Sequence, residues 1–385
     1  MNLLMPFGLS VLLNAYLAWR LVPSLAAYPP SQLLLVLVLL TCALAMPLSL
    51  VARRVARPPW ANVLNWVGLL CMGLFSTLLV LTLARDAALG LLGLVDWLAP
   101  GSLALEQWRT VSGQAVPVLA GLVTLMGFFN AWRTAAVVRV DVPIPGLPAA
   151  WHGFSVAQIS DVHVGPTIGQ RYVRRIVDKV NTLQADVVAI TGDLVDGRVH
   201  ELAAQVAPLA DLRSRHGSFF VTGNHEYYSG ANAWIDELRR LGLTVLLNQH
   251  VVIIPPAGAS PADAPLVLAG VTDFSAGGFD AAHRSDPVAA LHGAPEAAVR
   301  VLLAHQPRSA AAAALAGFDL QLSGHTHGGQ FYPWNLFVRF QQPFTAGLRK
   351  WDNLWVYTSR GTGYWGPPKR FGAPSEITHL RLVRA

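Results

Sequence analysis

The chain has 385 residues, of which 53% are hydrophobic and only 13% are charged, whereas an ordinary soluble domain has about 25% charged residues. This composition argues against a wholly soluble protein. The formal net charge is +6, but no run of adjacent Lys and Arg exceeds a pair, so the excess does not indicate a nucleic-acid partner. Attraction to anionic membrane lipids explains the positive charge equally well.

The apolar residues are concentrated at the N-terminal end. Residues 1–132 carry six Arg, two Asp, one Glu and no Lys. Within them lie four uncharged runs, and each is about as long as the 20 residues needed to cross a bilayer: Met1–Trp19, Leu33–Ala52, Trp60–Ala84 and Thr110–Trp132. We therefore expect an all-α membrane domain over residues 1–132. A fifth run, Ala87–Val95, is too short to cross.

The arginines between these runs predict the orientation of the chain. Arg53, Arg54 and Arg57 crowd the short link between the second and third spans, which places that link in the cytoplasm. Four spans then leave the C-terminal part in the cytoplasm, attached to the inner membrane of the cell by a multi-pass anchor. Three arginines disagree, because they fall on the predicted outer side: Arg20, Arg85 and Arg109.

After the membrane domain, we expect a linker over residues 133–150 and an α/β domain over 151–385. The stretch Val142–Ala150 is rich in Pro and Gly, which is typical of a connection. Short apolar runs then alternate with amphipathic helical stretches such as Gln170–Leu183 and Ala231–Leu241, the pattern of an α/β domain. The predicted strands are Phe154–Ile159, Asp186–Thr191, Ser218–Thr222, Thr244–Leu247, Leu266–Val271, Val301–Ala304, Leu320–Leu322, Leu354–Thr358 and Ile377–Leu382.

Polar motifs follow five of these strands. They are Asp161-x-His163, Gly192-Asp193-x-x-Asp196, Gly223-Asn224-His225-Glu226, His305 and Gly324-His325-x-His327. Ligands in α/β sheets bind outside the carboxyl ends of the strands, so we expect the five motifs to share one site. Each motif alone is weak, since a Gly-Asp or Gly-Asn pair is usually a turn. Their occurrence in order makes a common site the better interpretation.

The side chains in these motifs suit metal ions. Oxygen and nitrogen ligands without a thiolate favour Mn, Fe or Zn over Ca, and we expect Mn. Seven candidate ligands are too many for one tetrahedral ion and fit two divalent ions that share a carboxylate: Asp161, His163, Asp193, Asn224, His305, His325 and His327. His225 is then free to act as a proton donor, with Asp196 as its orienting partner.

The ordered motifs resemble the calcineurin-like metallophosphoesterase superfamily over about residues 152–385. The tail Tyr357–Pro368 is similar to that of bacterial membrane-associated phosphodiesterases of the YkuE-like or YaeI-like kind. The resemblance implies a four-layer α/β/β/α sandwich and hydrolysis by metal-activated hydroxide. It also implies these roles: Asp161, His163 and His327 hold the first ion, Asn224, His305 and His325 hold the second, Asp193 bridges the two, and His225, oriented by Asp196, protonates the leaving group.

The sequence is compatible with three functions. The first is a membrane-bound hydrolase of a phosphodiester or pyrophosphate bond, with a phosphorylated lipid as substrate. The second is a phosphodiesterase of soluble nucleotides or generic phosphoesters, and the third is a non-enzymatic membrane receptor or transporter with a structural metal domain. Arg360 or Arg370 could contact phosphate. An apolar wall beside the site could come from Tyr227, Tyr228, Tyr364 and Trp365.

Overall fold

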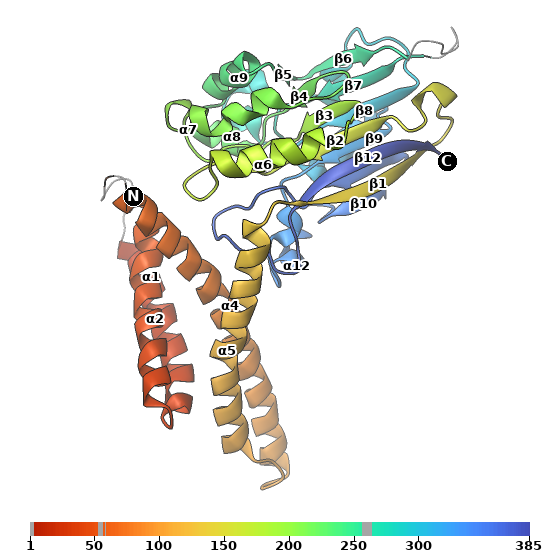
Figure 1. Cartoon of the computed structure of the whole chain (residues 1–385). Coiled ribbons are helices and arrows are strands. Elements are labelled where there is room, and N and C mark those ends of the chain that lie inside the picture. Colours follow the sequence, from red (N-terminus) through yellow and green to blue (C-terminus); the bar gives the residue numbers. More distant parts are fainter. Residues whose placement is uncertain (1–3, 53–56, 58, 256–263) are drawn as a thin grey trace. The chain divides into compact units, whose positions relative to one another are not determined.

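The computed structural model describes residues 4–52, 57, 59–255 and 264–385 (Figure 1). The start of the first predicted span (Met1–Leu3) and two arginines of the predicted cytoplasmic link, Arg53 and Arg54, lie outside the described residues. The chain folds as two compact units. One contains residues 1–129 and 366–371, and the other contains residues 130–365 and 372–385.

The first unit is helical. Four of its helices are long and apolar enough to cross a membrane: α1 (Leu4–Leu21, extended by the 3₁₀ turn Val22–Leu25), α2 (Pro29–Ser49), α4 (Trp60–Leu98) and α5 (Leu105–Trp132). They pack through a small apolar core that includes Leu17, Leu21, Leu39, Leu78 and Ala120.

Two of the helices run well past the uncharged segments that indicate them in the sequence. Helix α4 has 39 residues and continues through Arg85, Asp86 and the whole of the short run Ala87–Val95. Helix α5 begins at Leu105, before Arg109. Charged residues end an apolar run but not a helix, because Arg, Leu and Ala all favour helical backbone. A hydropathy criterion therefore finds the membrane-crossing part and misses the extension.

The helical unit also contains one short segment from far along the chain. Lys369 in the segment Gly366–Phe371 is 1% exposed. Its ammonium group donates to the Gly73 carbonyl oxygen at 2.8 Å, to Thr124 Oγ1 at 3.2 Å and to the Thr77 hydroxyl. The next backbone N–H, that of Arg370, donates to the Gly127 carbonyl oxygen at 2.8 Å. Six residues of the expected 151–385 domain, Gly366–Phe371, therefore belong to the helical unit.

The second unit contains two six-stranded sheets. The first has the strand order β1-β12-β2-β3-β4-β5, and the second has the order β10-β11-β9-β8-β7-β6. Strands β2 to β4 are parallel neighbours, as are β7 to β9. The strands are β1 (Ala136–Ile144), β2 (Ser155–Ile159), β3 (Val187–Ile190), β4 (Ser218–Phe220), β5 (Thr244–Val245), β6 (Gln249–Ile253), β7 (Leu266–Gly270), β8 (Val299–Leu303), β9 (Leu320–Ser323), β10 (Gly347–Trp351), β11 (Leu354–Thr358) and β12 (Glu376–Arg384).

The predicted linker over residues 133–150 is wrong for half of its length, because Ala136–Ile144 form strand β1. This strand pairs in parallel with the last strand, β12, from Ala136 opposite Glu376 to Ile144 opposite Arg384. The Pro and Gly residues of Val142–Ala150 suggest a loop, but the preceding AVVRVDV is rich in β-branched residues, which favour strands.

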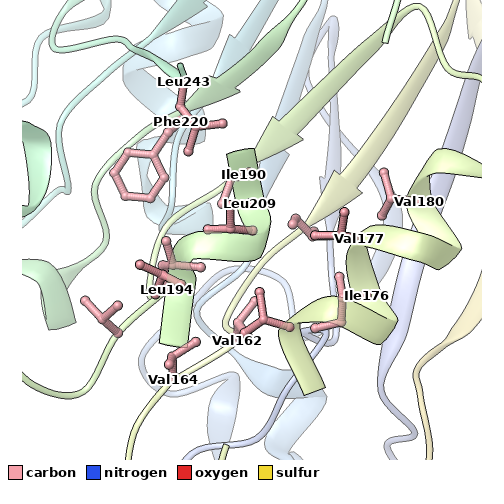
Figure 2. Packing of buried hydrophobic residues seen from close by; sticks show 14 of the residues in the cluster. Val162, Val164, Ile176, Val177, Val180, Ile190, Leu194, Leu209, Phe220 and Leu243 are labelled. Carbon is pink, nitrogen blue, oxygen red and sulfur yellow. The ribbon is translucent and has the colours of Figure 1, made fainter. Parts of the chain in front are cut away.

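Three apolar clusters separate four layers in this unit. Residues of both sheets, such as Val187 and Leu268, form the central core. The outer face of the first sheet is covered by α6 (Gln170–Asn181), α7 (Val199–Val206) and α9 (Ala231–Arg240), while α10 (Pro287–Ala290) and α11 (Ala310–Leu315) cover the second sheet. Figure 2 shows Ile176, Val177 and Val180 of α6 within the first of these outer clusters. The four-layer α/β/β/α sandwich expected from the sequence is confirmed.

Candidate metal centre

The seven predicted metal ligands all follow strands, in loops at the carboxyl ends. Asp161 and His163 follow β2, Asp193 follows β3, and His305 follows β8. Asn224 starts the short helix α8 (Asn224–Ser229) after β4, and His325 and His327 follow β9. The structure brings six of these seven side chains, together with His225, into three overlapping groups, and within each group the possible ligand atoms lie within 4.8 Å of one another. The groups are Asp161/His163/His327, His163/Asp193/His225 and Asp193/His305/His325.

The backbone at this site is in an unusual conformation. Five of the seven residues have a positive φ, a region that non-glycine residues seldom occupy: Asp161 (52°), His163 (55°), Asp193 (51°), His325 (70°) and His327 (53°). Each such residue costs about 1–3 kcal/mol and persists only where the surroundings enforce it. The conformation of the loops that directs these side chains into the site therefore raises the local free energy of the backbone.

The hydrogen bonds of two histidines show which ring nitrogens are left for a metal. His305 Nδ1 lies 2.7 Å from the Thr191 carbonyl oxygen, to which it donates. Its Nε2 lone pair then faces Asp193 Oδ2 at 3.1 Å and His325 Nδ1 at 3.2 Å. His163 Nδ1 donates to Asp196 at 3.0 Å, so its Nε2 faces His327 Nε2, also at 3.0 Å.

Ring nitrogens and a carboxylate that converge in this way share either a proton or a metal cation. Among the described residues, the buried Oδ1 of Asn224 has no hydrogen-bond donor, which again leaves an oxygen lone pair open to an ion. The local charge agrees. Burial alone would lower the pKa of His163, but the carboxylates of Asp196, Asp193 and Asp161 raise that pKa to about 9. The residues present fit divalent cations.

Glu226 organises the loops that carry these ligands, a role that sequence reasoning missed. It is fully buried, and its carboxylate accepts four backbone N–H groups, from Gly223 (2.6 Å), Leu194 (2.8 Å), Asp193 (3.0 Å) and Val195 (3.3 Å). Burial, followed by the nearby Asp193 carboxylate, raises the pKa of Glu226 to about 7. The side chain ties the loop after β3 to the loop after β4. Its only sequence signal is its place directly after Asn224-His225.

Asp196 contacts two histidines rather than one. A single oxygen, Oδ1, accepts from His225 Nδ1 at 2.6 Å and from His163 Nδ1 at 3.0 Å. The sequence assigned Asp196 only to His225. In the structure this carboxylate also fixes the tautomer of a candidate metal ligand, an arrangement common around metal-binding histidines. Although burial would raise the pKa of Asp196, the two imidazoles hold that pKa well below its usual range.

Two of the four aromatic residues expected to form an apolar wall lie against His225. The Tyr228 and Trp365 rings are 5.2 and 5.7 Å from the His225 ring, edge to face, and both are more than half exposed. They line a depression of about 530 Å³ together with Asp196, Gly197, Arg198, His200, Glu201, His225 and Ser229. Tyr227 instead bonds to His283, and Tyr364 bonds to the Thr167 carbonyl oxygen.

The two arginines considered for phosphate contact have other partners. Arg360 forms an ion pair with the buried Glu376, whose Oε2 lies 2.6 Å from Arg360 Nη2. Arg370 is fully buried in the segment that belongs to the helical unit.

Gly324 offers a test of the metal centre, because a Cβ there would lie 2.1 Å from Asp161 Oδ2 and 2.0 Å from Ser160 Oγ. We expect Gly324→Ala to displace Asp161 and to lower the metal content of manganese-reconstituted protein from two ions per chain to one or fewer, as measured by elemental analysis. Gly278→Ala is the matched control, since a Cβ at Gly278 meets nothing within 4 Å. Two tightly bound ions in the Gly324→Ala protein would contradict the assignment of Asp161.

Comparison with known proteins agrees with this geometry. The calcineurin-like phosphoesterase family profile matches residues 154–329, a stretch that contains all seven candidate ligands. A Bos taurus transmembrane protein with metallophosphoesterase domain is 41% identical over 278 residues, which are 70% of this chain and 63% of the relative. A Danio rerio protein of the same name is 34% identical over 85% of this chain and 75% of its own length.

The similarity extends to bacterial proteins. The Bacillus subtilis metallophosphoesterase YkuE is 26% identical over 61% of this chain and 81% of its own length, in line with the resemblance seen in the sequence. The match to the bovine protein leaves about a third of that relative uncovered. With the profile spanning the metal centre and the fish protein matched over most of both chains, this chain belongs to the calcineurin-like phosphoesterase family.

Proposed function

We propose that the chain is a membrane-bound hydrolase that uses two divalent cations to cleave a phosphodiester or pyrophosphate bond in a lipid-linked substrate. One observation carries the hydrolase part of this proposal. Imidazole and carboxylate lone pairs face one another at 3.0–3.2 Å, with the proton of His163 and that of His305 each held on the opposite ring nitrogen.

The geometry supports a division of the ligands between two ions. Asp161, His163 and His327 form one group, while Asp193, His305 and His325 form another. The buried Oδ1 of Asn224, which has no hydrogen-bond donor in the part of the chain that the structure describes, is proposed as a further ligand of the second ion. Asp193 has neighbours in both sets, since its Oδ2 is 3.1 Å from His305 Nε2 and 3.9 Å from His163 Nε2. Manganese is the expected metal, and iron or zinc suits the same donors. Bound there, the ions would activate water and neutralise charge on the phosphoryl group.

The residues of the chain supply the remaining chemistry. His225 Nδ1–H donates a hydrogen bond to Asp196, which leaves Nε2 as the atom that can give a proton to a leaving alkoxide. His225 Nε2 lies 4.0 Å from Asp193 Oδ2, farther than His305 Nε2 at 3.1 Å, although His225 belongs to the group His163/Asp193/His225. The depression next to His225 is where the leaving group would lie.

The lipid-linked substrate is supported by the four apolar helices, which would keep the protein at a membrane surface. A second candidate, a soluble nucleotide, is favoured by the exposed Tyr228 and Trp365 rings at the rim of the depression. Aromatic faces stack readily on nucleobases.

The test compares a lipid-linked nucleotide diphosphate with its water-soluble counterpart that lacks the acyl chains, both hydrolysed by full-length metal-loaded protein in mixed micelles. We expect kcat/KM to be at least about tenfold higher for the lipid form, since two or three buried methylene groups at ~0.8 kcal/mol each suffice. Equal values would make the soluble nucleotide the better assignment. Absence of hydrolysis of both compounds and of simple phosphodiesters would contradict a hydrolase.

His225→Ala should separate proton donation from metal binding. Because His225 is not among the seven principal ligands, we expect the variant to keep both ions while kcat falls by about 10²-fold or more, the usual scale of general acid catalysis. The loss should shrink for p-nitrophenyl esters, whose leaving group needs little protonation. Asp193→Asn is the contrasting variant and should lose metal and activity together. Equal loss of metal from the two variants would refute the role given to His225.

The phosphoesterase unit is proposed to face the cytoplasm, on the strength of the arginine-rich link between α2 and α4. A reporter fused after Ala385 tests this in bacteria. A fluorescent protein that matures only in the cytoplasm should be bright, and an alkaline phosphatase active only in the periplasm should be inactive. The reverse pattern would mean that the whole arrangement is inverted or that one helix does not cross.

A further inference from the structure

Three arginines that fit the orientation rule poorly meet around one cavity in the helical unit. Arg20 lies at the end of α1, Arg85 lies in α4, and Arg109 lies in the first turns of α5. A cavity of about 630 Å³ is lined by these three residues and by Trp19, Asp86 and Glu106, among others. Residues separated by up to 89 positions in the sequence thus form a single charged site.

Asp86 is the centre of this cluster, and its hydrogen-bonding capacity is largely used. Its carboxylate accepts from Tyr16 Oη at 2.6 Å, from Arg20 Nε and Nη2 at 2.8 Å each, and from Arg85 Nη1 at 3.0 Å. Arg85 is nearly covered, with 7% of its side chain exposed, and it also donates to Ser112 Oγ and to the Arg109 carbonyl oxygen at 2.9 Å each. These hydrogen bonds therefore connect the three helices α1, α4 and α5 around the cavity.

The charges around the cavity do not cancel. Three guanidinium groups, those of Arg20, Arg85 and Arg109, face two carboxylates, Asp86 and Glu106, which leaves one positive charge in excess. Glu106 pairs with Arg109 at 2.5 Å at the exposed rim. Arg20 and Arg85 share the single carboxylate of Asp86. A partly covered positive charge favours an anionic ligand that can accept charge-assisted hydrogen bonds.

The position of the cluster along the helices points to the headgroup layer. Trp60 and Arg85 are 25 positions apart on one continuous helix, which is ~37 Å at a rise of 1.5 Å per residue and exceeds the ~30 Å hydrocarbon core of a bilayer. Trp19 is exposed and lies beside Arg20, whose Cζ is 5.1 Å from the ring centroid. Tryptophan favours the membrane–water interface.

We propose that this cavity binds the phosphodiester of an anionic phospholipid headgroup. A singly charged phosphodiester matches the single excess positive charge, and a lipid phosphate lies at the depth where the helices present the cluster. Arg20 is the main contact, because its guanidinium lines the cavity with 29% of the side chain exposed. This site is separate from the metal centre and needs no catalysis.

The test counts lipids bound to full-length protein by native mass spectrometry after removal of co-purified lipid in a neutral detergent. Titration with short-chain phosphatidylglycerol should show one saturable binding event, with weaker binding of phosphatidylcholine, which carries no net charge. Arg20→Gln should weaken phosphatidylglycerol binding by about tenfold or more, the effect of losing a hydrogen-bonded charge contact. Asp86 keeps Tyr16 and Arg85 as donors in this variant.

Arg133→Gln is the matched control, since it removes an equal charge directly after the other end of α5 and should leave binding unchanged. Equal weakening by Arg20→Gln and Arg133→Gln, no weakening by Arg20→Gln, or equal binding of the two lipids would overturn the proposal. Displacement of the lipid by millimolar inorganic phosphate would assign the cavity to free phosphate instead and would also overturn it.

Glu106→Gln keeps the proposal testable if Arg20→Gln does not fold. Glu106 is 82% exposed, so its replacement should leave the helices intact while it raises the excess charge at the cavity from one to two. Binding of phosphatidylglycerol should tighten by roughly twofold or more. Unchanged or weaker binding in this variant would contradict recognition by charge.

Discussion

Six candidate ligand side chains lie in groups whose ligand atoms are within 4.8 Å of one another, and the strands and loops of the phosphoesterase unit have to hold them there. Groups of this kind repel when no cation lies between them, so the protein has to fix them through the backbone. Parallel strands provide the first part of the solution, because β2 to β4 and β7 to β9 all deliver their carboxyl ends to one edge. Positive φ angles at five ligand positions provide the second part.

Two carboxylates that are not principal ligands hold this arrangement in place. Glu226 gathers four backbone N–H groups from the loops after β3 and β4, and Asp196 sets the ring orientation of His163 and His225 together. The two carboxylates accept hydrogen bonds from buried N–H groups. A buried N–H group without an acceptor would lower the stability of the fold. The chemistry of the site therefore depends on residues just behind it as well as on the ligands.

Six of the seven candidate ligands lie in groups that could hold a metal ion, and the sequence signal that indicates them is local. A polar motif directly after a buried strand, as at Asp161 and Asp193, is visible within a few residues, and the sheet edge then brings the motifs together. Strand β1 escapes such reasoning, since its pairing with β12 depends on residues some 240 positions away. The role of Glu226 is hidden for a related reason, because an acidic residue gives no sign of whether it faces an ion or the backbone.

The helical unit also contains contacts that could not be predicted from the sequence. Uncharged runs indicate where helices cross a membrane, but they cannot show that Arg20, Arg85 and Arg109 meet around Asp86. Nor can they show that Lys369 is buried among helices whose sequences end long before it. Contacts of this kind depend on which faces of the helices meet, a property that composition does not encode.

The place of Lys369 has a consequence for the order of assembly. Its partner Thr124 precedes it by 245 residues, which at about 5–20 residues per second takes ~12–50 s to synthesise. During that time the Gly73 carbonyl and the Thr77 and Thr124 hydroxyls have no lysine to bind, although their helices are already made. The helical unit can therefore reach its final packing only after residue 369 has been synthesised. Completion of the helical unit thus depends on the earlier synthesis of residues 130–365, which form most of the phosphoesterase unit.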